Sequence, residues 1–459
     1  MTTFEAPLPT DQLLSTMDAV VGVADDVEIA VLARAGEYTR FAGGVIHQPQ
    51  DITEVQYLVR AVVDGHACRR ATTVAARLAD TARAAADAAR ARARAVGTPG
   101  TADVAGPQSD APTAPVWFDD VTLFDTGVRV GAARDAMAAA AAIGGTAAGM
   151  FGRAVTQQAV VTSRGLRRAT TATEASGALT VQVGNGTAHW IDLSRSADRL
   201  ALGRSVSATI EQAVAGKGRV ELPPGTYEVV LGAEAVTELV HFLPALGFSG
   251  ELAAAGAGLV AGHHGERIVS DLLDVADDAG ADVGLPIGFD IEGVTKRRVP
   301  FFEHGRVGSA VTDRATAAAL GTESTGHAHI AREEVPAPAA ANIVLAPGTL
   351  TEAELIAGVE HGVYVQRFWY TRLVDRVTGT ITGVTRDACF RIENGRLAQP
   401  LHGTRFTQSV PALLAGVLAV GSGIRSQPVM NVWNGATSAP PVRAAAFRFG
   451  AAPVDGGNR

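Results

Sequence analysis

The chain has 459 residues, of which 47% are hydrophobic and 19% charged, and its formal net charge is −8 at pH 7. This composition excludes a disordered chain and is typical of a globular protein large enough for two or three domains. The negative charge argues against a general affinity for nucleic acid, which needs a clustered basic face. Cys68 and Cys389 lie far apart, so no disulfide framework is expected. Because the sequence contains neither an export signal nor an apolar run of spanning length, we expect a cytoplasmic protein without a membrane span.

The first hundred residues predict a short helix, two strands and a long helix. A helical pattern from Asp11 leads into an alternating strand over residues 27–33, and turn glycines with a second apolar run follow over residues 36–47. The chain is expected to become helical from Asp51, and residues 71–95 are dense in Ala and Arg. The arginines spread over several faces without aromatic neighbours, which favours a solvated helix over a nucleic-acid-binding one.

A segment rich in Pro, Gly, Ser and Thr, residues 97–115, predicts a linker. A small-residue helix is expected over residues 127–152, and short strands separated by glycines begin near Gln158. The prediction is therefore an α+β fold. Its three parts are an N-terminal strand-helix domain (1–105), a middle antiparallel sheet region (113–217) and a C-terminal β-rich domain with helices (224–457).

Residues 229–250 are the first place to look for chemistry. Apolar side chains recur there at helical spacing and predict a short helix with His241 beside a buried stripe. A zinc hydrolase needs two His ligands on one helical face and a neighbouring Glu as general base. This helix contains only one histidine.

Two other groups of histidines and acids lie in segments without a strong helical frame. For both groups, solvent-exposed loop histidines are favoured over a metal site, because spacing alone is a weak indication. Cys389 lies in an alternating apolar strand, so a core position is favoured over a nucleophile. The two groups are His263 and His264 with Glu266, and His327 and His329 with Glu333 and Glu334.

An aromatic run flanked by arginines covers residues 367–372, in a chain with only 5% aromatic residues. Exposed aromatic side chains and arginine are enriched in interfaces, so Arg367, Trp369 and Tyr370 are candidates for a substrate groove or a protein interface. The alternative, a buried strand with Trp369 in the core, stays open at this point.

Several stretches, taken in order, resemble the TldD/PmbA family. Each motif is weak alone, but their order and spacing make the resemblance specific, most of all in the C-terminal half. The stretches span nearly the whole chain and are residues 40–47, 299–305, 312–318, 324–326, 342–365 and 392–421.

The resemblance implies a two-subunit zinc metallopeptidase, in which a TldD subunit carries a His-Glu-x-x-x-His helix and a later Cys ligand. The TldE (PmbA) subunit resembles it without the metal site. In the matching segment of this chain, His241 takes the first His position, Phe242 replaces the Glu and Leu246 replaces the second His. Residues 421–427, where the Cys ligand would fall, contain no cysteine. The resemblance therefore implies a TldE-like subunit, with zinc expected only in a TldD-like partner.

The chain alone is not expected to hydrolyse peptides, because a single imidazole holds zinc weakly and no positioned carboxylate can take a proton from bound water. The expected role is a dimer with the TldD-like subunit that helps to enclose an unfolded peptide. Two alternatives stay open: a metallopeptidase with an altered site that uses His241 and other histidines, and a stand-alone peptide-binding or regulatory protein.

Overall fold

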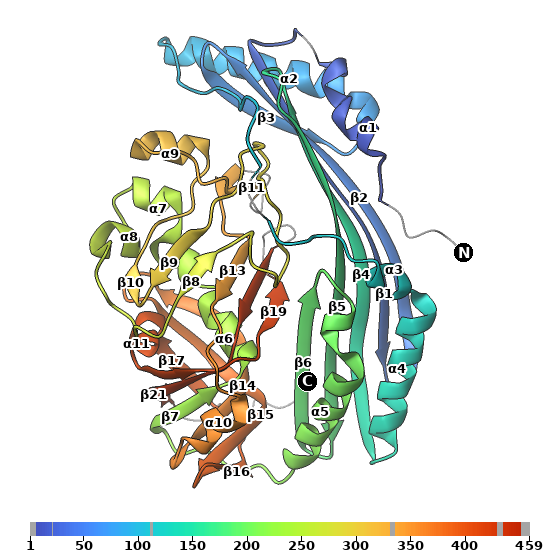
Figure 1. The fold of residues 1–459 in the computed structure, drawn as a ribbon, viewed down its shortest axis with the longest axis vertical. Coiled ribbons are helices and arrows are strands. Elements are labelled where there is room, and N and C mark those ends of the chain that lie inside the picture. The colour runs from blue at the N-terminus through green and yellow to red at the C-terminus, as the bar shows by residue number, and fades with distance from the viewer. Residues whose placement is uncertain (1–5, 21, 111–112, 331–335, 429–434, 451–459) are drawn as a thin grey trace.

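The computed structural model describes residues 6–20, 22–110, 113–330, 336–428 and 435–450. These residues form a mixed α+β fold, as the sequence predicts, with three large sheets and a two-stranded ribbon. Figure 1 shows the first sheet running along one side of the molecule with the C-terminal half beside it. None of the helices in the described part of the chain has the length and apolar character needed to cross a membrane.

The first sheet has the strand order β3-β2-β1-β4-β5-β6, and every neighbouring pair is antiparallel. Its hairpins turn at glycines, and Gly43 and Gly44 take the positive φ angles that such tight turns require. The strands are β1 (Asp26–Ala42), β2 (Val45–Val63), β3 (His66–Thr72), β4 (Gly145–Thr162), β5 (Arg167–Val183) and β6 (Gly186–Ser194).

The prediction for residues 36–63 was wrong in two places. Strand β1 continues through Gly36, where the missing side chain leaves room for the ring of Tyr38; a Cβ there would lie 2.6 Å from the Tyr38 hydroxyl. The residues after Asp51, expected to be helical, extend β2 to Val63. Pairing with β1 on one side and β3 on the other outweighs the local helix preference.

The helices of this half pack on the sheet. Helix α2 was predicted to be solvated, but one face of small residues, including Ala82, Ala85 and Ala89, is buried against β2 and β3. The helix predicted over residues 127–152 ends at Ala141, and its remainder belongs to β4. The helices are α1 (Thr10–Leu14), η1 (Thr16–Ala19), η2 (Ala75–Arg77), α2 (Leu78–Val96), α3 (Asp120–Leu123), α4 (Thr126–Ala141), η3 (Asp198–Leu200) and α5 (Leu202–Ala215).

The predicted linker lies between β3 and β4, and its described residues form neither helix nor strand. The strands on its two sides belong to one continuous sheet. The boundary between residues 1–105 and 113–217 therefore separates two segments of the same sheet, and the division into three domains stays a prediction.

The second and third sheets build the C-terminal half. The second sheet has the order β10-β9-β8-β13-β20-β19, with β13 and β20 parallel. In the third sheet, β14 pairs with both β7 and β15. The strands β14, β7, β21, β17 and β15 therefore form a closed ring of paired strands. The strands of the second sheet are β8 (Val275–Asp277), β9 (Val299–Glu303), β10 (Arg306–Val307), β13 (Asn342–Leu345), β19 (Arg425–Pro428) and β20 (Ala436–Ala439). The two-stranded ribbon consists of β11 (Ala328–Ile330) and β12 (Pro336–Pro338). The strands of the third sheet are β7 (Gly225–Leu231), β14 (His361–Asp375), β15 (Thr380–Glu393), β16 (Arg396–Pro400), β17 (Arg405–Ser409), β18 (Val417–Val420) and β21 (Val442–Phe449).

Helix α6 lies between these two sheets, as Figure 1 shows, and contacts β14, β19 and β20. Helix α10 begins with a capping box: the Thr351 hydroxyl accepts from the Glu354 N–H, and the Glu354 carboxylate accepts from the Thr351 N–H. The helices of this half are α6 (Ala233–Val240), the π-helical turn η4 (Pro244–Phe248), α7 (Gly250–Ala254), α8 (Gly258–His263), α9 (Arg314–Leu320), α10 (Glu352–Ala357) and α11 (Val410–Ala415).

Candidate functional site

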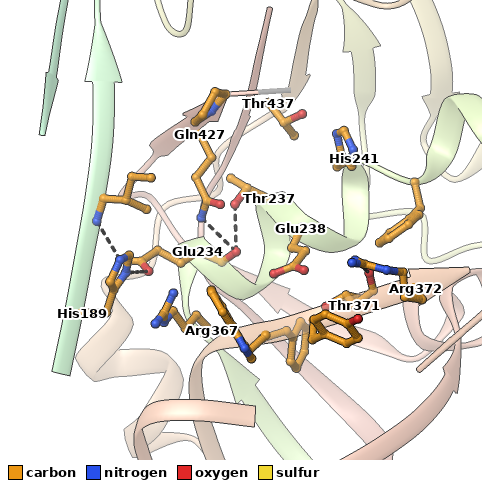
Figure 2. A pocket seen from close by; sticks show the side chains of 16 residues that line it. His189, Glu234, Thr237, Glu238, His241, Arg367, Thr371, Arg372, Gln427 and Thr437 are labelled. Carbon is orange, nitrogen blue, oxygen red and sulfur yellow. Dashed lines mark hydrogen bonds and ion pairs between the residues drawn. The ribbon is translucent and has the colours of Figure 1, made fainter. Parts of the chain in front are cut away.

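A cavity of about 480 Å³ lies where α6 meets β14, and it brings together the two segments that the sequence indicated, around His241 and residues 367–372 (Figure 2). Its volume is in the range of small-molecule and peptide side-chain sites. The lining residues are His189 and Ile191 of β6; Glu234, Thr237, Glu238, His241 and Phe242 of α6 and the turn after it; residues 367–372 of β14; and Gln427, Pro428 and Thr437 of β19 and β20.

Helix α6 turns one polar face to the cavity and its apolar face to the core. Glu234, Thr237, Glu238 and His241 occupy positions i, i+3, i+4 and i+7, which lie on the same side of a helix. The other side is apolar and belongs to the largest hydrophobic cluster of the C-terminal half. Burial of the apolar face therefore fixes the direction in which the polar face points.

Glu234 joins the first sheet to α6. Its carboxylate lies 2.8 Å from Nδ1 of His189 and accepts a 3.2 Å hydrogen bond from the backbone N–H of Ile191. The Gln427 amide donates to the Glu234 carbonyl at 3.1 Å. Three elements from distant parts of the chain are thus held at one end of the cavity (Figure 2).

Glu238 faces the centre of the cavity (Figure 2). Burial raises the pKa of its carboxyl group, while the Thr371 hydroxyl and the Arg367 and Arg372 guanidinium groups oppose that rise. Among the described residues it forms no ion pair within 4 Å, in contrast to Glu234. Its neutral form is favoured relative to an exposed glutamate.

His241 follows the last residue of α6 and packs edge-on against Phe242, with ring centroids 5.7 Å apart. Burial lowers the pKa of its imidazole, so the neutral ring is favoured. The buried hydroxyl of Thr437 lies on the same side of the cavity and has no hydrogen-bond partner in the described part of the chain (Figure 2).

The β14 wall is irregular. The register of β14 with β15 shifts between Trp369 and Arg372, and Tyr370 in this bulge has a φ of 57°, which is rare for a residue other than glycine. Phe368 is buried, whereas Trp369 is 49% and Tyr370 68% exposed. The alternative that placed Trp369 in the core was therefore wrong. The core position belongs to Phe368, because adjacent side chains of a strand point to opposite faces.

Arginines surround the exposed aromatic rings. The guanidinium carbons of Arg367 and Arg386 lie 5.4 and 4.5 Å from the centre of the Trp369 ring, and that of Arg372 lies 4.4 Å from the centre of Tyr370. Arg367 also donates through Nε to Asp387 at 2.5 Å. These contacts hold both aromatic side chains at the mouth of the cavity.

Sequence reasoning missed several residues of this cavity. Glu234 and Glu238 precede His241 at helical spacing, so that pattern could have identified them. His189 and Thr437 come from β6 and β20, and no local pattern connects them to α6. They reach the cavity only because strands of all three large sheets meet there.

The other histidine groups lie away from this cavity. His263 and His264 are exposed as predicted, and His263 pairs with Glu266 at 2.8 Å. The prediction was wrong for His327 and His329, which are buried. Glu333 and Glu334 lie outside the described residues.

A satisfied polar network explains why His327 is buried. Its Nε2 lies 2.9 Å from Asp277, and its Nδ1 lies 2.9 Å from the Thr325 hydroxyl. The other oxygen of Asp277 accepts from the backbone N–H groups of Ala341 and Asn342 at 2.6 and 3.0 Å. These partners offset the cost of removing the ring and the carboxylate from water.

The residues around His241 do not fit a zinc site. Phe242 is apolar, and Leu246 is 2% exposed inside the core, so neither the general-base position nor the second-ligand position holds a donor. Nowhere in the described ranges do three His, Cys, Asp or Glu side chains group as metal ligands do. Cys389 is buried, and burial raises its pKa to about 11, which disfavours the nucleophilic thiolate.

Residues 224–451 match a family model described as the PmbA/TldA metallopeptidase C-terminal domain. The chain is 31% identical over 205 residues to a metalloprotease of Methanothermobacter thermautotrophicus, an alignment that covers 44% of each protein. It is 28% identical over 185 residues to a zinc metalloprotease TldD homolog of Saccharolobus solfataricus, covering 39% of this chain and 40% of the relative. The chain thus matches less than half of the length of these curated relatives.

The fold is similar to a solved structure over nearly its whole length. The crystal structure of TldE from Thermococcus kodakarensis superposes with a TM-score of 0.83 and 19% sequence identity, covering 96% of this chain and 99% of that one. At this identity the likeness concerns the fold. The match of residues 224–451 places the C-terminal half of the chain in the TldD/PmbA family, and the superposition extends the likeness in fold over nearly the whole chain.

Proposed function

We propose that this chain is a non-catalytic, TldE-like subunit that pairs with a TldD-like zinc metallopeptidase in the cytoplasm and helps to hold unfolded peptides. Its own contribution is the cavity between α6 and β14. The chain holds no cofactor of its own in this proposal, and the zinc belongs to the partner. Its metallopeptidase relatives support the class of reaction.

The observation that carries the proposal is the surroundings of His241. Where a zinc peptidase needs a general base and a second ligand after the first histidine, this chain has Phe242 and the buried Leu246. The same helix nevertheless keeps a polar face toward a cavity of about 480 Å³. A helix that lacks the zinc ligands but still lines a cavity with polar side chains is suited to binding rather than to hydrolysis.

A peptide is the ligand that this cavity accommodates best. Its lining combines exposed aromatic rings with carboxyl, imidazole and hydroxyl groups, so it offers both apolar contact and hydrogen bonds. Beyond Val365, no described strand pairs with the edge of β14 that β7 occupies, because the chain leaves β7 at Gly232 to form α6. An extended segment can lie along that edge.

The metal content and peptidase activity of the purified chain test the catalytic part of this proposal. We expect less than about a tenth of an equivalent of zinc and no cleavage of an unstructured peptide, since one neutral imidazole is too weak a site. Cleavage is expected when a TldD-like subunit is added. Near-stoichiometric zinc and cleavage by the chain alone, both lost in His241→Ala, would instead support an altered metallopeptidase.

Co-purification tests the partner. We expect a complex of this chain with a TldD-like subunit in size-exclusion chromatography. If the chain forms only homodimers in the presence of that subunit, the stand-alone peptide-binding or regulatory role replaces the proposal.

A further inference from the structure

We infer that the cavity between α6 and β14 recognises a carboxylate on the bound peptide, either an acidic side chain or the C-terminal carboxylate. This inference rests on the proposed peptide-holding function and names the chemical class of the group that the cavity selects. It follows from the charges that remain unpaired around the cavity, from a buried hydroxyl group and from the exposed aromatic side chains.

Arg372 of the cavity lining and Arg386, which lies over the lining residue Trp369, have no carboxylate partner within 4 Å among the described residues. Arg372 donates to the Thr371 carbonyl at 2.8 Å and lies over Tyr370, and Arg386 lies over Trp369. Both are exposed. Arg367 differs from them, because Asp387 neutralises it. The guanidinium group binds carboxylates through two parallel hydrogen bonds, so these two groups are available for an acidic ligand.

The interior of the cavity adds hydrogen-bonding groups to these two arginines. Glu234 is paired with His189. Glu238 has no ion-pair partner in the described part of the chain, and burial raises the pKa of its carboxyl group, whose protonated form can donate a hydrogen bond. Thr437 offers a buried hydroxyl that no described residue contacts by a hydrogen bond. A carboxylate that entered from the mouth would accept hydrogen bonds from these groups.

A basic ligand fits this arrangement less well. It would have to pass Arg372 and Arg386, and among the described residues of the lining it would find one carboxyl group without an ion-pair partner, that of Glu238. The faces of Trp369 already lie against two guanidinium groups, so this ring has little capacity for a third cation. The uncompensated charge at the mouth is therefore positive.

Trp369 and Tyr370 supply the apolar contact. Both are about half or more exposed, and Tyr370 keeps a left-handed backbone conformation, with a φ of 57°, that is unfavourable for a residue with a side chain. Trp, Tyr and Arg are the residue types that contribute most to binding energy at interfaces. This bulge is consistent with a surface shaped for a ligand.

Binding of four dye-labelled, unstructured peptides to the full-length chain tests the inference by fluorescence anisotropy at pH 7.5. The peptides share one Gly- and Ser-rich sequence. The first carries two glutamates and an amidated C-terminus, the second two lysines, the third two glutamines, and the fourth two glutamines with a free C-terminus. We expect at least one carboxylate peptide, the first or the fourth, to bind about tenfold more tightly than the lysine and amidated glutamine peptides, and the tighter of the two identifies the source of the carboxylate.

Variants that remove individual charged groups around the cavity sharpen this test. We expect Arg372→Gln and Arg386→Gln together to weaken the preferred carboxylate peptide about tenfold without weakening the lysine peptide. Arg396→Gln is the matched control and should bind as the unaltered chain does, because this exposed arginine of β16 neither lines the cavity nor lies over Trp369 or Tyr370. Glu238→Gln keeps a neutral donor and should bind the carboxylate peptide at least as tightly as the unaltered chain does. If the cavity were instead a site for cations, this substitution would lower its affinity for the lysine peptide.

The outcomes separate the two proposals. Preference for the lysine peptide, or loss of carboxylate binding in Glu238→Gln, overturns the carboxylate inference. Equal binding of all four peptides also overturns it, but leaves the peptide-holding function standing. Failure to bind any of the four overturns both.

Discussion

Burial lowers the pKa of both His241 and His329, although they lie in different parts of the C-terminal half. For His241, desolvation is the cause. For His329, desolvation is joined by the positive charge of Lys296, and its pKa falls to about 4. The sequence identified both residues but could not tell their surroundings, because one histidine in a polar segment looks the same whether the segment is exposed or covered.

His329 makes a testable contribution to the pH dependence of stability. Between pH 4 and 6.5 the unfolded chain binds more protons at this residue than the folded one, so the free energy of unfolding should rise with pH across that window. The contribution is fully present above pH 6.5 and is lost as the pH falls toward 4, by an amount on the order of 3 kcal/mol. Denaturant unfolding at several pH values should show a flatter dependence for His329→Gln than for the unaltered chain.

The exposed His361 of β14 provides the control for this measurement. His361→Gln should keep the slope of the unaltered chain. An unchanged slope in His329→Gln would contradict the burial-based explanation. Asp277 acts in a different window: its pKa is lowered, with His327 among the causes, so its contribution is lost only as the pH falls below the usual aspartate range.

The segment from α6 to η4 combines a predicted part with an unpredicted one. Helical spacing predicted α6 and its buried stripe. The sharp turn that follows was not predicted: Gly247 has a φ of 138°, and a Cβ there would lie 2.1 Å from the backbone nitrogen of Leu259. This close approach joins residues from two helices, and periodicity within one helix carries no information about it.

Substitution of Leu246 tests whether this position now serves packing. Leu246 is buried in the main core of the C-terminal half, so Leu246→Ala should lower the free energy of unfolding by about 2–5 kcal/mol. Leu397→Ala, on a half-exposed side chain of β16, should cost less than about 1 kcal/mol. Equal effects of the two substitutions in urea unfolding would show that position 246 is not a packing position.

The first sheet makes the N-terminal and middle segments interdependent. Strand β1 pairs with β2 on one side and with β4 on the other, across the predicted linker. A hydrophobic cluster likewise joins Val27 and Ile29 of β1 to Ala159 and Val161 of β4. Neither segment can complete its core without the other.

Truncation tests this interdependence. A fragment of residues 1–112 should lack cooperative thermal unfolding, because it exposes one whole edge of β1 and loses part of its core. A fragment of residues 1–220, which contains all six strands, should regain a cooperative transition in circular dichroism. Cooperative unfolding of the shorter fragment would support residues 1–105 as an independent domain.

The sequence by itself determined the α+β class, helices including α2 and α6, the departure from the zinc-ligand pattern at Phe242 and Leu246, and the resemblance to the TldD/PmbA family. These features depend on local periodicity and on the chemical identity of single residues. Only the tertiary structure decided that residues after Asp51 form a strand, that His327 is buried, and that α6, β14, β6 and β20 share one cavity. The physical reason is that strand pairing and burial depend on partners far away in the chain, which no local pattern specifies.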